Sequence, residues 1–242
     1  MCSDGGCHAH PRLSPPRIGG GGERLGATDL PALAHEIAMR TFLHVGCGPV
    51  YPDSPTQQTQ RIKGFPAREW KEIRLDINPE VKPDVVGSMT DMSAVATGSV
   101  DAIYSSHNIE HLYPHEVPVA MAEFKRVLRA DGLAVITCPD LQSVCALVAE
   151  DKLTDAAYNS PSGPITPLDI LYGLRTSMGA GNLYMAHRCG FTLKVLLGTL
   201  QASGFAKVVG RRRPRAFDLW AVASVADMDD AKLKELARKF FP

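Results

Sequence analysis

The sequence has 242 residues, of which 45% are hydrophobic and 21% are charged, as in an ordinary globular protein. Its 26 basic residues balance its 26 acidic ones, and this zero formal charge argues against a large non-specific nucleic-acid surface. No apolar run approaches the roughly 20 residues of a membrane helix, and the N-terminus lacks the apolar core of a secretory signal. We therefore expect a cytoplasmic protein with reduced cysteines.

The first 27 residues are rich in Gly, Pro and Ser and cannot bury enough apolar surface to offset the entropy of ordering. We expect a disordered tail at 1–27 and a folded domain at 28–242. The cysteines and histidines of the tail match no structural zinc spacing, so we assign no metal to it.

Strands and helices are expected to alternate along the folded domain. A helix is expected from about residue 29, and β-prone runs follow at 41–45, 73–77, 81–86 and 100–104, with a turn-rich loop at 51–70. An amphipathic helix at 115–129 ends at Asp131-Gly132, before a continuous apolar strand at 133–137. Helices at 141–150 and 192–203, strands at 205–210 and 217–224, and a helix from about 228 complete the pattern. Such alternation predicts an α/β three-layer sandwich with a mostly parallel seven-stranded sheet and helices on both faces.

Two signals at the ends of consecutive strands point to a nucleoside ligand. Gly46-Cys47-Gly48 follows the first strand, where glycine lets the backbone approach a ligand closely. Asp76 ends the second strand, where a carboxylate can accept hydrogen bonds from both ribose hydroxyls. The third glycine of a dinucleotide fingerprint would stand where the chain has Tyr51. The pattern therefore favours a ligand with a ribose and no pyrophosphate.

The order of several motifs is similar to that of the class I S-adenosylmethionine-dependent methyltransferases. The motifs are His44-Val45-Gly46-Cys47-Gly48, Leu75-Asp76-Ile77, Asp84-Val85-Val86-Gly87-Ser88-Met89, Ser99 to Tyr104, His107-Asn108-Ile109-Glu110-His111, and Phe124 to Gly132. The match is close over 41–141 and loose over 187–224. It implies a Rossmann-like fold, S-adenosylmethionine as the cofactor and methyl transfer as the activity.

The resemblance also implies roles for individual residues. The glycine loop would hold the amino-acid part of the cofactor, Asp76 its ribose and Ser88-Met89 its adenine. The expected cofactor-binding residues are His44, Gly46, Cys47, Gly48, Asp76, Ile77, Ser88, Met89 and Ser106.

The chain departs from the family pattern in three places. His44 stands where an acidic residue is common, Val50 replaces the third glycine of the loop, and Ser88 replaces an Asp often found beside adenine. We hypothesise that Asp91 partly supplies the missing adenine contact.

His107 is the candidate general base, because an imidazole pKa near ~6.5 suits proton transfer at neutral pH. The run His107-x-x-Glu110-His111 also matches the H-x-x-E-H pattern of a zinc metalloprotease. Pro114 leaves too little room for the long helix of such a site, and the sequence offers no clear third ligand. We therefore predict no metal.

Residues 142–190 follow the fifth strand, where related methyltransferases often build a substrate cover, and we expect such a cover here. The candidate substrate-contacting residues are His111, Asp140, Tyr172 and His187. A separate basic run, Arg211 to Arg215, is expected to be a solvated loop.

Neutral charge and the lack of an added recognition domain favour a small-molecule acceptor, with no nucleic acid or membrane as partner. Two alternatives stay open at this point. One is a protein that binds S-adenosylmethionine without catalysis, because the glycine loop is degenerate. The other is a nicotinamide-dependent oxidoreductase.

Overall fold

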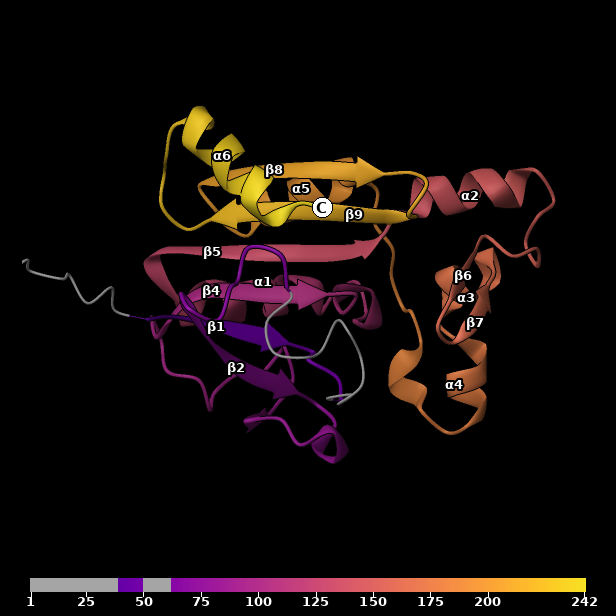
Figure 1. Ribbon diagram of the computed structural model, residues 1–242, viewed down its shortest axis with the longest axis horizontal. Coiled ribbons are helices and arrows are strands. Elements are labelled where there is room, and N and C mark those ends of the chain that lie inside the picture. The colour runs from indigo at the N-terminus through magenta and orange to yellow at the C-terminus, as the bar shows by residue number, and fades with distance from the viewer. Residues whose placement is uncertain (1–38, 50–61) are drawn as a thin grey trace, which may run out of the picture. The chain divides into compact units, whose positions relative to one another are not determined.

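The structure is a computed structural model that describes residues 39–49 and 62–242 (Figure 1). The expected tail at 1–27, the helix expected from about residue 29 and most of the loop expected at 51–70 lie outside the described residues.

A seven-stranded sheet forms the centre of the described domain, in the order β3-β2-β1-β4-β5-β9-β8. All neighbouring strands are parallel except for the pairs made by β9, which confirms the predicted mostly parallel sheet. The strands are β1 (Arg40–Val45), β2 (Trp70–Asp76), β3 (Val85–Val86), β4 (Val100–Ser106), β5 (Leu128–Pro139), β8 (Lys207–Arg213) and β9 (Asp218–Ser224). Because β1 lies between β2 and β4, the strand order reverses there, and a ligand crevice is expected at its carboxyl end.

Helices cover both faces of the sheet, as the alternation of buried residues along β1 requires. Leu43 belongs to an apolar cluster with α1 (Val117–Val127) and α5 (Leu193–Ala202), whereas its neighbour Phe42 belongs to a second cluster with α6 (Asp230–Phe240). Successive side chains of a strand point to opposite faces, so the two clusters lie on opposite sides of the sheet. In the second cluster the rings of Phe65 and Phe240 are 4.9 Å apart.

Two predicted elements need correction. The strand expected at 81–86 is confined to 85–86, since η1 (Pro79–Val81), a 3-10 helix, precedes it. Asn78 caps this helix and Lys82 ends it in a left-handed conformation, with φ 50°. The helix expected at 115–129 ends at Val127, and β5 begins at once, with an irregular register to β4 before Leu133.

The basic run is also not a solvated loop. Its first residues belong to β8, and two of its guanidinium groups form ion pairs: Arg212 with Asp140, and Arg213 with Asp218. The sequence pattern hid this because both partners come from other segments.

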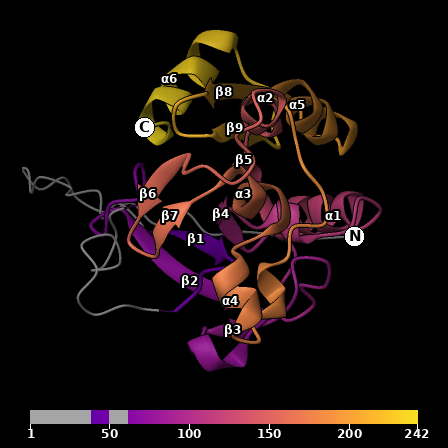
Figure 2. The same cartoon turned by 90° about the vertical axis from the view of Figure 1, so that its right-hand side faces the viewer.

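The segment between β5 and α5 forms a small body of its own at the carboxyl end of the parallel strands (Figures 1 and 2). It contains α2 (Leu141–Ala149), the hairpin β6 (Tyr158–Ser160) and β7 (Gly163–Ile165), α3 (Pro167–Tyr172), α4 (Arg175–Gly179) and η3 (Leu183–Met185). Val144, Ile165 and Ile170 form its apolar core. Among the described helices, none has the length and apolar character of a membrane span.

Candidate active site

The glycine loop after β1 turns back toward β2. The backbone N–H groups of Gly46 and Cys47 both donate to the carbonyl of Leu75, at 2.8 and 3.2 Å. Gly46 and Gly48 have φ values of 67° and 61°, in the left-handed region that glycine reaches without a steric penalty. The two glycines are therefore required by the backbone conformation of the loop.

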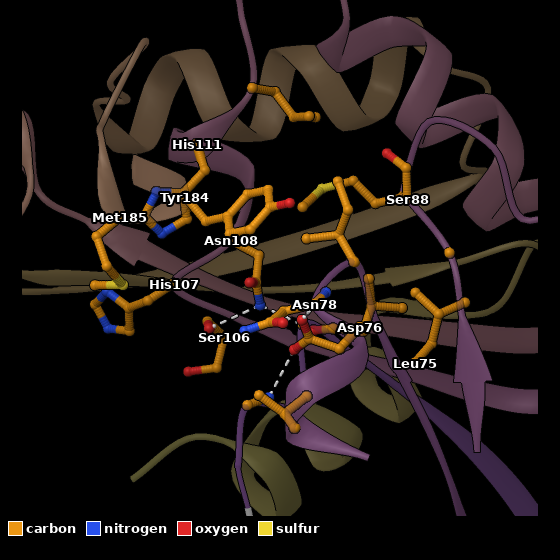
Figure 3. Close-up of a pocket in the computed structure, with 18 of the residues that line it drawn as sticks. Leu75, Asp76, Asn78, Ser88, Ser106, His107, Asn108, His111, Tyr184 and Met185 are labelled. Carbon is orange, nitrogen blue, oxygen red and sulfur yellow. Dashed lines mark hydrogen bonds between the residues drawn. The ribbon is translucent and has the colours of Figure 1, made fainter. Parts of the chain in front are cut away.

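Asn108 braces this loop from the end of β4. Its side-chain Nδ2 donates to the carbonyls of Val45 and Ser106, at 2.8 and 2.9 Å (Figure 3). A Cβ added to Gly46 would lie 1.9 Å from the Asn108 Oδ1, so the asparagine fills the space that the missing side chain leaves. Asn108 stands directly beside His107 in the sequence motif, but nothing in the sequence pattern indicates this role for it.

Asp76 ends β2 and is 8% exposed. Its Oδ2 accepts a hydrogen bond from the Gly48 N–H at 2.8 Å, and its Oδ1 accepts one from the Asn78 N–H at 2.9 Å. The carboxylate thus holds the glycine loop against the end of β2. An ionised carboxylate has about four lone-pair sites, so acceptor capacity remains after these two bonds.

These loops line a pocket of about 290 Å³ at the carboxyl ends of β1, β2 and β4 (Figure 3). The sheet brings together most of the residues that the sequence predicted, although they come from separate strands and loops. The predicted residues in its lining are Gly46, Gly48, Asp76, Ile77, Ser88, Met89, Ser106, His107 and His111.

His44 and Cys47 do not line this pocket. The His44 ring hydrogen-bonds the Glu72 carboxylate at 2.7 Å, because alternate residues of β1 point to opposite faces of the sheet. Cys47 is buried, and burial raises the pKa of its thiol to about 11. Asp91 also lies outside the pocket; its carboxylate accepts the Ser93 N–H at 3.1 Å.

His107 lies between this pocket and a second one. It is a non-glycine residue with φ 53°, and its N–H donates to the Thr137 carbonyl at 3.0 Å. Its half-exposed side chain places Nδ1 3.4 Å from Oε1 of the buried Glu110. Burial opposes protonation of His107, but the neighbouring Glu110 carboxylate outweighs it and raises the pKa of the imidazole.

The second pocket has a volume of about 520 Å³ and shares His107, His111 and Met185 with the first. The predicted substrate residue His187 lies in its wall. Its remaining walls come from β5, the β6–β7 hairpin, α3 and the turn between β8 and β9.

The other two predicted substrate residues lie elsewhere. Asp140 is fully buried; it caps α2 and pairs with Arg212, so it holds α2 to β8 and does not face a pocket. Tyr172 is 61% exposed and lines neither pocket. Its backbone carbonyl accepts a hydrogen bond from the His187 N–H at 3.1 Å.

Sequence reasoning missed the residues that the inserted segment contributes to the first pocket. Asn182, Tyr184, Met185 and Arg188 line it beside the strand-end residues. No local pattern marks them, since their place depends on how the segment folds back onto the sheet. The Arg188 N–H donates to the backbone carbonyl of Glu110 at 2.8 Å and fixes the return of the chain.

Comparison with known proteins agrees with this geometry. A family described as a methyltransferase domain matches residues 43–136, which include the glycine loop, Asp76 and the strands that flank them. No curated protein matches the chain.

Among solved structures, a protein from Pyrococcus horikoshii OT3 is similar with a TM-score of 0.51 at 13% identity, over 78% of this chain and 84% of that one. At this identity the likeness concerns the fold alone. An S-adenosylmethionine-dependent methyltransferase from Archaeoglobus fulgidus is 15% identical over 78% of this chain and 87% of that one, with a TM-score of 0.47. A Burkholderia thailandensis 1,6-didemethyltoxoflavin-N1-methyltransferase, solved with bound 1,6-didemethyltoxoflavin and S-adenosylhomocysteine, is 16% identical over 78% of this chain and 72% of that one, with a TM-score of 0.46.

The matched domain contains the strand-order reversal, the glycine loop and the carboxylate at the end of β2. Residues 43–136 of this chain therefore match a methyltransferase domain, and the strands around them have its Rossmann-like arrangement.

Proposed function

We propose that this protein is an S-adenosylmethionine-dependent methyltransferase that holds its cofactor in the first pocket and methylates a small molecule that enters the second. The observation that carries the proposal is the contact between the Asp76 carboxylate and the glycine loop, at the point where the strand order reverses. The pocket fits the cofactor, because Asp76 retains acceptor capacity for ribose hydroxyls and the glycines leave room for the amino-acid part. We assign the adenine to the part of the pocket that Ser88 and Met89 line.

When bound, S-adenosylmethionine supplies a methyl group on a positively charged sulfur. The protein contributes mainly proximity and alignment, which can lower a barrier by about 7–11 kcal/mol. Two pockets that share His107, His111 and Met185 support this arrangement, because a cofactor in one and an acceptor in the other would meet at their common wall. The volume of the second pocket, about 520 Å³, suits a small molecule.

His107 stands at that common wall, and we assign it the role of general base. If the acceptor carries a proton into the reaction, His107 would take that proton as the methyl group moves from the sulfonium sulfur to the acceptor, with S-adenosylhomocysteine as the leaving group. His107→Ala is expected to slow methyl transfer by a larger factor than it weakens cofactor binding, and His115→Ala is the matched control. His115 is exposed, stacks on Tyr113 and lines neither pocket. Near-normal turnover by His107→Ala would exclude the base.

We further propose that residues 142–190 form the substrate cover. Its support is that this segment contributes walls to both pockets, among them Tyr184 to the first and Tyr158 to the second. Limited proteolysis with and without S-adenosylhomocysteine is the test. We expect cleavage between 155 and 185 to slow when the ligand is present, and equal cleavage would contradict a cover.

Calorimetric titration with S-adenosylhomocysteine tests the cofactor site. Asp76→Asn removes the negative charge and one acceptor, and a lost charge-assisted hydrogen bond of about 1.5–3 kcal/mol corresponds to roughly 10- to 150-fold weaker binding. The control is Asp101→Asn. Asp101 also accepts a backbone N–H, that of Thr41 at 2.7 Å, but it lies at the opposite end of β1. Unchanged affinity in Asp76→Asn would remove the basis of the site assignment.

Activity itself is measured as S-adenosylhomocysteine formed from S-adenosylmethionine in the presence of pooled small molecules that carry hydroxyl, amine or thiol groups. We expect formation to depend on at least one acceptor. Tight cofactor binding with no product from any pool would contradict methyl transfer to a small molecule.

A further inference from the structure

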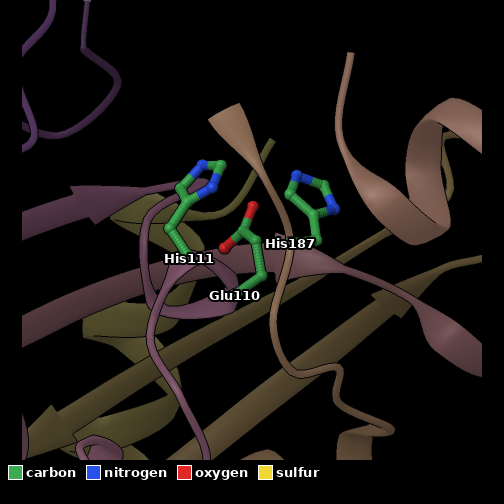
Figure 4. Close-up of side chains that lie close together, drawn as sticks. All are labelled: Glu110, His111 and His187. Atoms are coloured by element: carbon green, nitrogen blue, oxygen red, sulfur yellow. The ribbon is translucent and has the colours of Figure 1, made fainter. Parts of the chain in front are cut away.

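We propose that Glu110, His111 and His187 form a binding site for one divalent transition-metal ion of the zinc type. Glu110 and His111 belong to η2 (Ile109–His111), and His187 follows η3 in the inserted segment. One potential ligand atom from each residue lies within 4.8 Å of the others, and both imidazoles flank the carboxylate (Figure 4). Two imidazoles and one carboxylate are a donor set found in catalytic zinc sites.

On each of the two histidines, one ring nitrogen is hydrogen-bonded to a backbone carbonyl and the other remains available to a metal. His111 Nδ1 lies 3.1 Å from the carbonyl of Ala186, and His187 Nδ1 lies 2.8 Å from the carbonyl of Ile170. A carbonyl oxygen only accepts, so each Nδ1 must carry the hydrogen. In the neutral ring, Nε2 then keeps its lone pair. Metal-binding histidines are commonly oriented in this way by a backbone carbonyl.

Glu110 supplies an independent observation. Its side chain is 1% exposed, and neither carboxylate oxygen has a hydrogen-bond partner among the described residues. Among the described residues, His107 is close enough for an ion pair when protonated, with its Nδ1 3.4 Å from Oε1. A buried carboxylate without hydrogen bonds is costly, and a cation would supply the missing partner.

The site would be open on one side. All three residues line the second pocket, so coordination positions not filled by protein face the space assigned above to the acceptor. Zinc bonds to imidazole and carboxylate are about 2.0–2.2 Å long, so the ligand atoms must move closer by roughly an ångström when the ion binds. This part of the inference rests on the proposed function. If the acceptor occupies the second pocket, the ion favours an acceptor that offers it an oxygen atom.

The H-x-x-E-H motif alone did not indicate this site, because the sequence has no long helix there and no nearby third ligand. The fold supplies both the local geometry and the third ligand. The 3-10 turn already brings the adjacent Glu110 and His111 together, and the inserted segment returns to the strand end with His187. Hydrogen bonds from the N–H groups of Arg188 and Cys189 to the Glu110 carbonyl, at 2.8 and 3.2 Å, hold this return.

Cobalt binding to the full chain tests the proposal. After treatment with a chelator and gel filtration, we titrate Co²⁺ and Zn²⁺ and follow the visible spectrum of cobalt and the bound metal after equilibrium dialysis. We expect one ion per chain with nitrogen and oxygen ligation. Because loss of an outer hydrogen bond alone costs about 10- to 100-fold in metal affinity, His187→Ala and Glu110→Gln should each weaken binding at least tenfold. His115→Ala is the control and should bind as the wild type does.

The cysteines of the N-terminal segment are a competing source of metal binding. Cys2→Ser combined with Cys7→Ser should therefore keep the ion, and the cobalt spectrum should lack sulfur-to-metal absorption. Absence of a stoichiometric ion in the wild type, or an ion retained in His187→Ala, would overturn the proposal.

Folding and cofactor binding are followed in the same variants. Zn²⁺ should raise the thermal midpoint of the wild type but not that of Glu110→Gln. S-adenosylhomocysteine affinity should be unchanged in His187→Ala, since His187 does not line the first pocket. If the wild type binds the cofactor but no metal, the metal site is refuted and the proposed function stands. If it binds the metal but no cofactor, the proposed function is refuted and the metal site stands.

Discussion

Substitution of the two glycines in the loop after β1 should have very different costs. At Gly48 an added Cβ meets no atom within 4 Å, so Gly48→Ala introduces only the strain of a left-handed alanine at φ 61°, about 1–2 kcal/mol. Gly46→Ala carries the same strain and also places Cβ 1.9 Å from the Asn108 Oδ1. The Asn108 side chain must then leave, with the loss of two hydrogen bonds worth about 0.5–1.5 kcal/mol each.

The expected loss of stability is therefore about 1–2 kcal/mol for Gly48→Ala and about 2–5 kcal/mol for Gly46→Ala. Asn108→Ala removes the obstructing atoms, so in that background Gly46→Ala should cost only the backbone strain. The double-mutant cycle should give a coupling of about 1–3 kcal/mol between the two positions. Urea unfolding followed by circular dichroism measures all four free energies of unfolding. Equal losses for the two glycine variants, or additivity of Gly46→Ala and Asn108→Ala, would refute the packing argument.

Two further predictions concern buried carboxylates. The Arg175 guanidinium holds the pKa of Asp169 below its ordinary value of 3.8, so this carboxylate stabilises the fold above that pH and the contribution is lost as the solution becomes more acidic. Asp169→Asn should lower the free energy of unfolding at neutral pH and flatten its decline below about pH 4 in urea titrations; an equally steep decline would contradict the assignment. Arg212→Ala leaves Asp140 buried without its cation and should lower the free energy of unfolding by about 3 kcal/mol or more. Arg211 is exposed, and Arg211→Ala should lower it by less than about 0.5 kcal/mol. Similar thermal midpoints for the two variants would show that the ion pair does not hold α2 to β8.

The order of strands and helices could be predicted because hydrophobic periodicity is a local property of the chain. Leu43 and Phe42 alternate between the two faces of β1 as period-2 patterning requires, and the apolar stripe of α1 follows the helical repeat. The glycine loop and Asp76 could also be found in the sequence, since each directly follows or ends a strand. Parallel strands then bring them to one edge of the sheet.

Other features depended on contacts between segments that are distant in the sequence. His44 stands next to the glycine loop, yet its side chain pairs with Glu72 of the neighbouring strand. Asp140 follows β5 at the edge where ligands bind, yet Arg212 of β8 draws it into a buried ion pair. Each residue type is compatible with a site, and only its partner shows that it serves the fold.

The sequence by itself predicted the methyltransferase-like order of motifs, the sheet and the carboxylate at the end of β2, because motif order and short-range periodicity depend on neighbouring residues. Tertiary structure alone decided that Asn108 fills the space beside Gly46 and that His187 joins Glu110 and His111. The physical reason is that these contacts depend on the path of the inserted segment and on side-chain packing across strands, which no local repeat specifies.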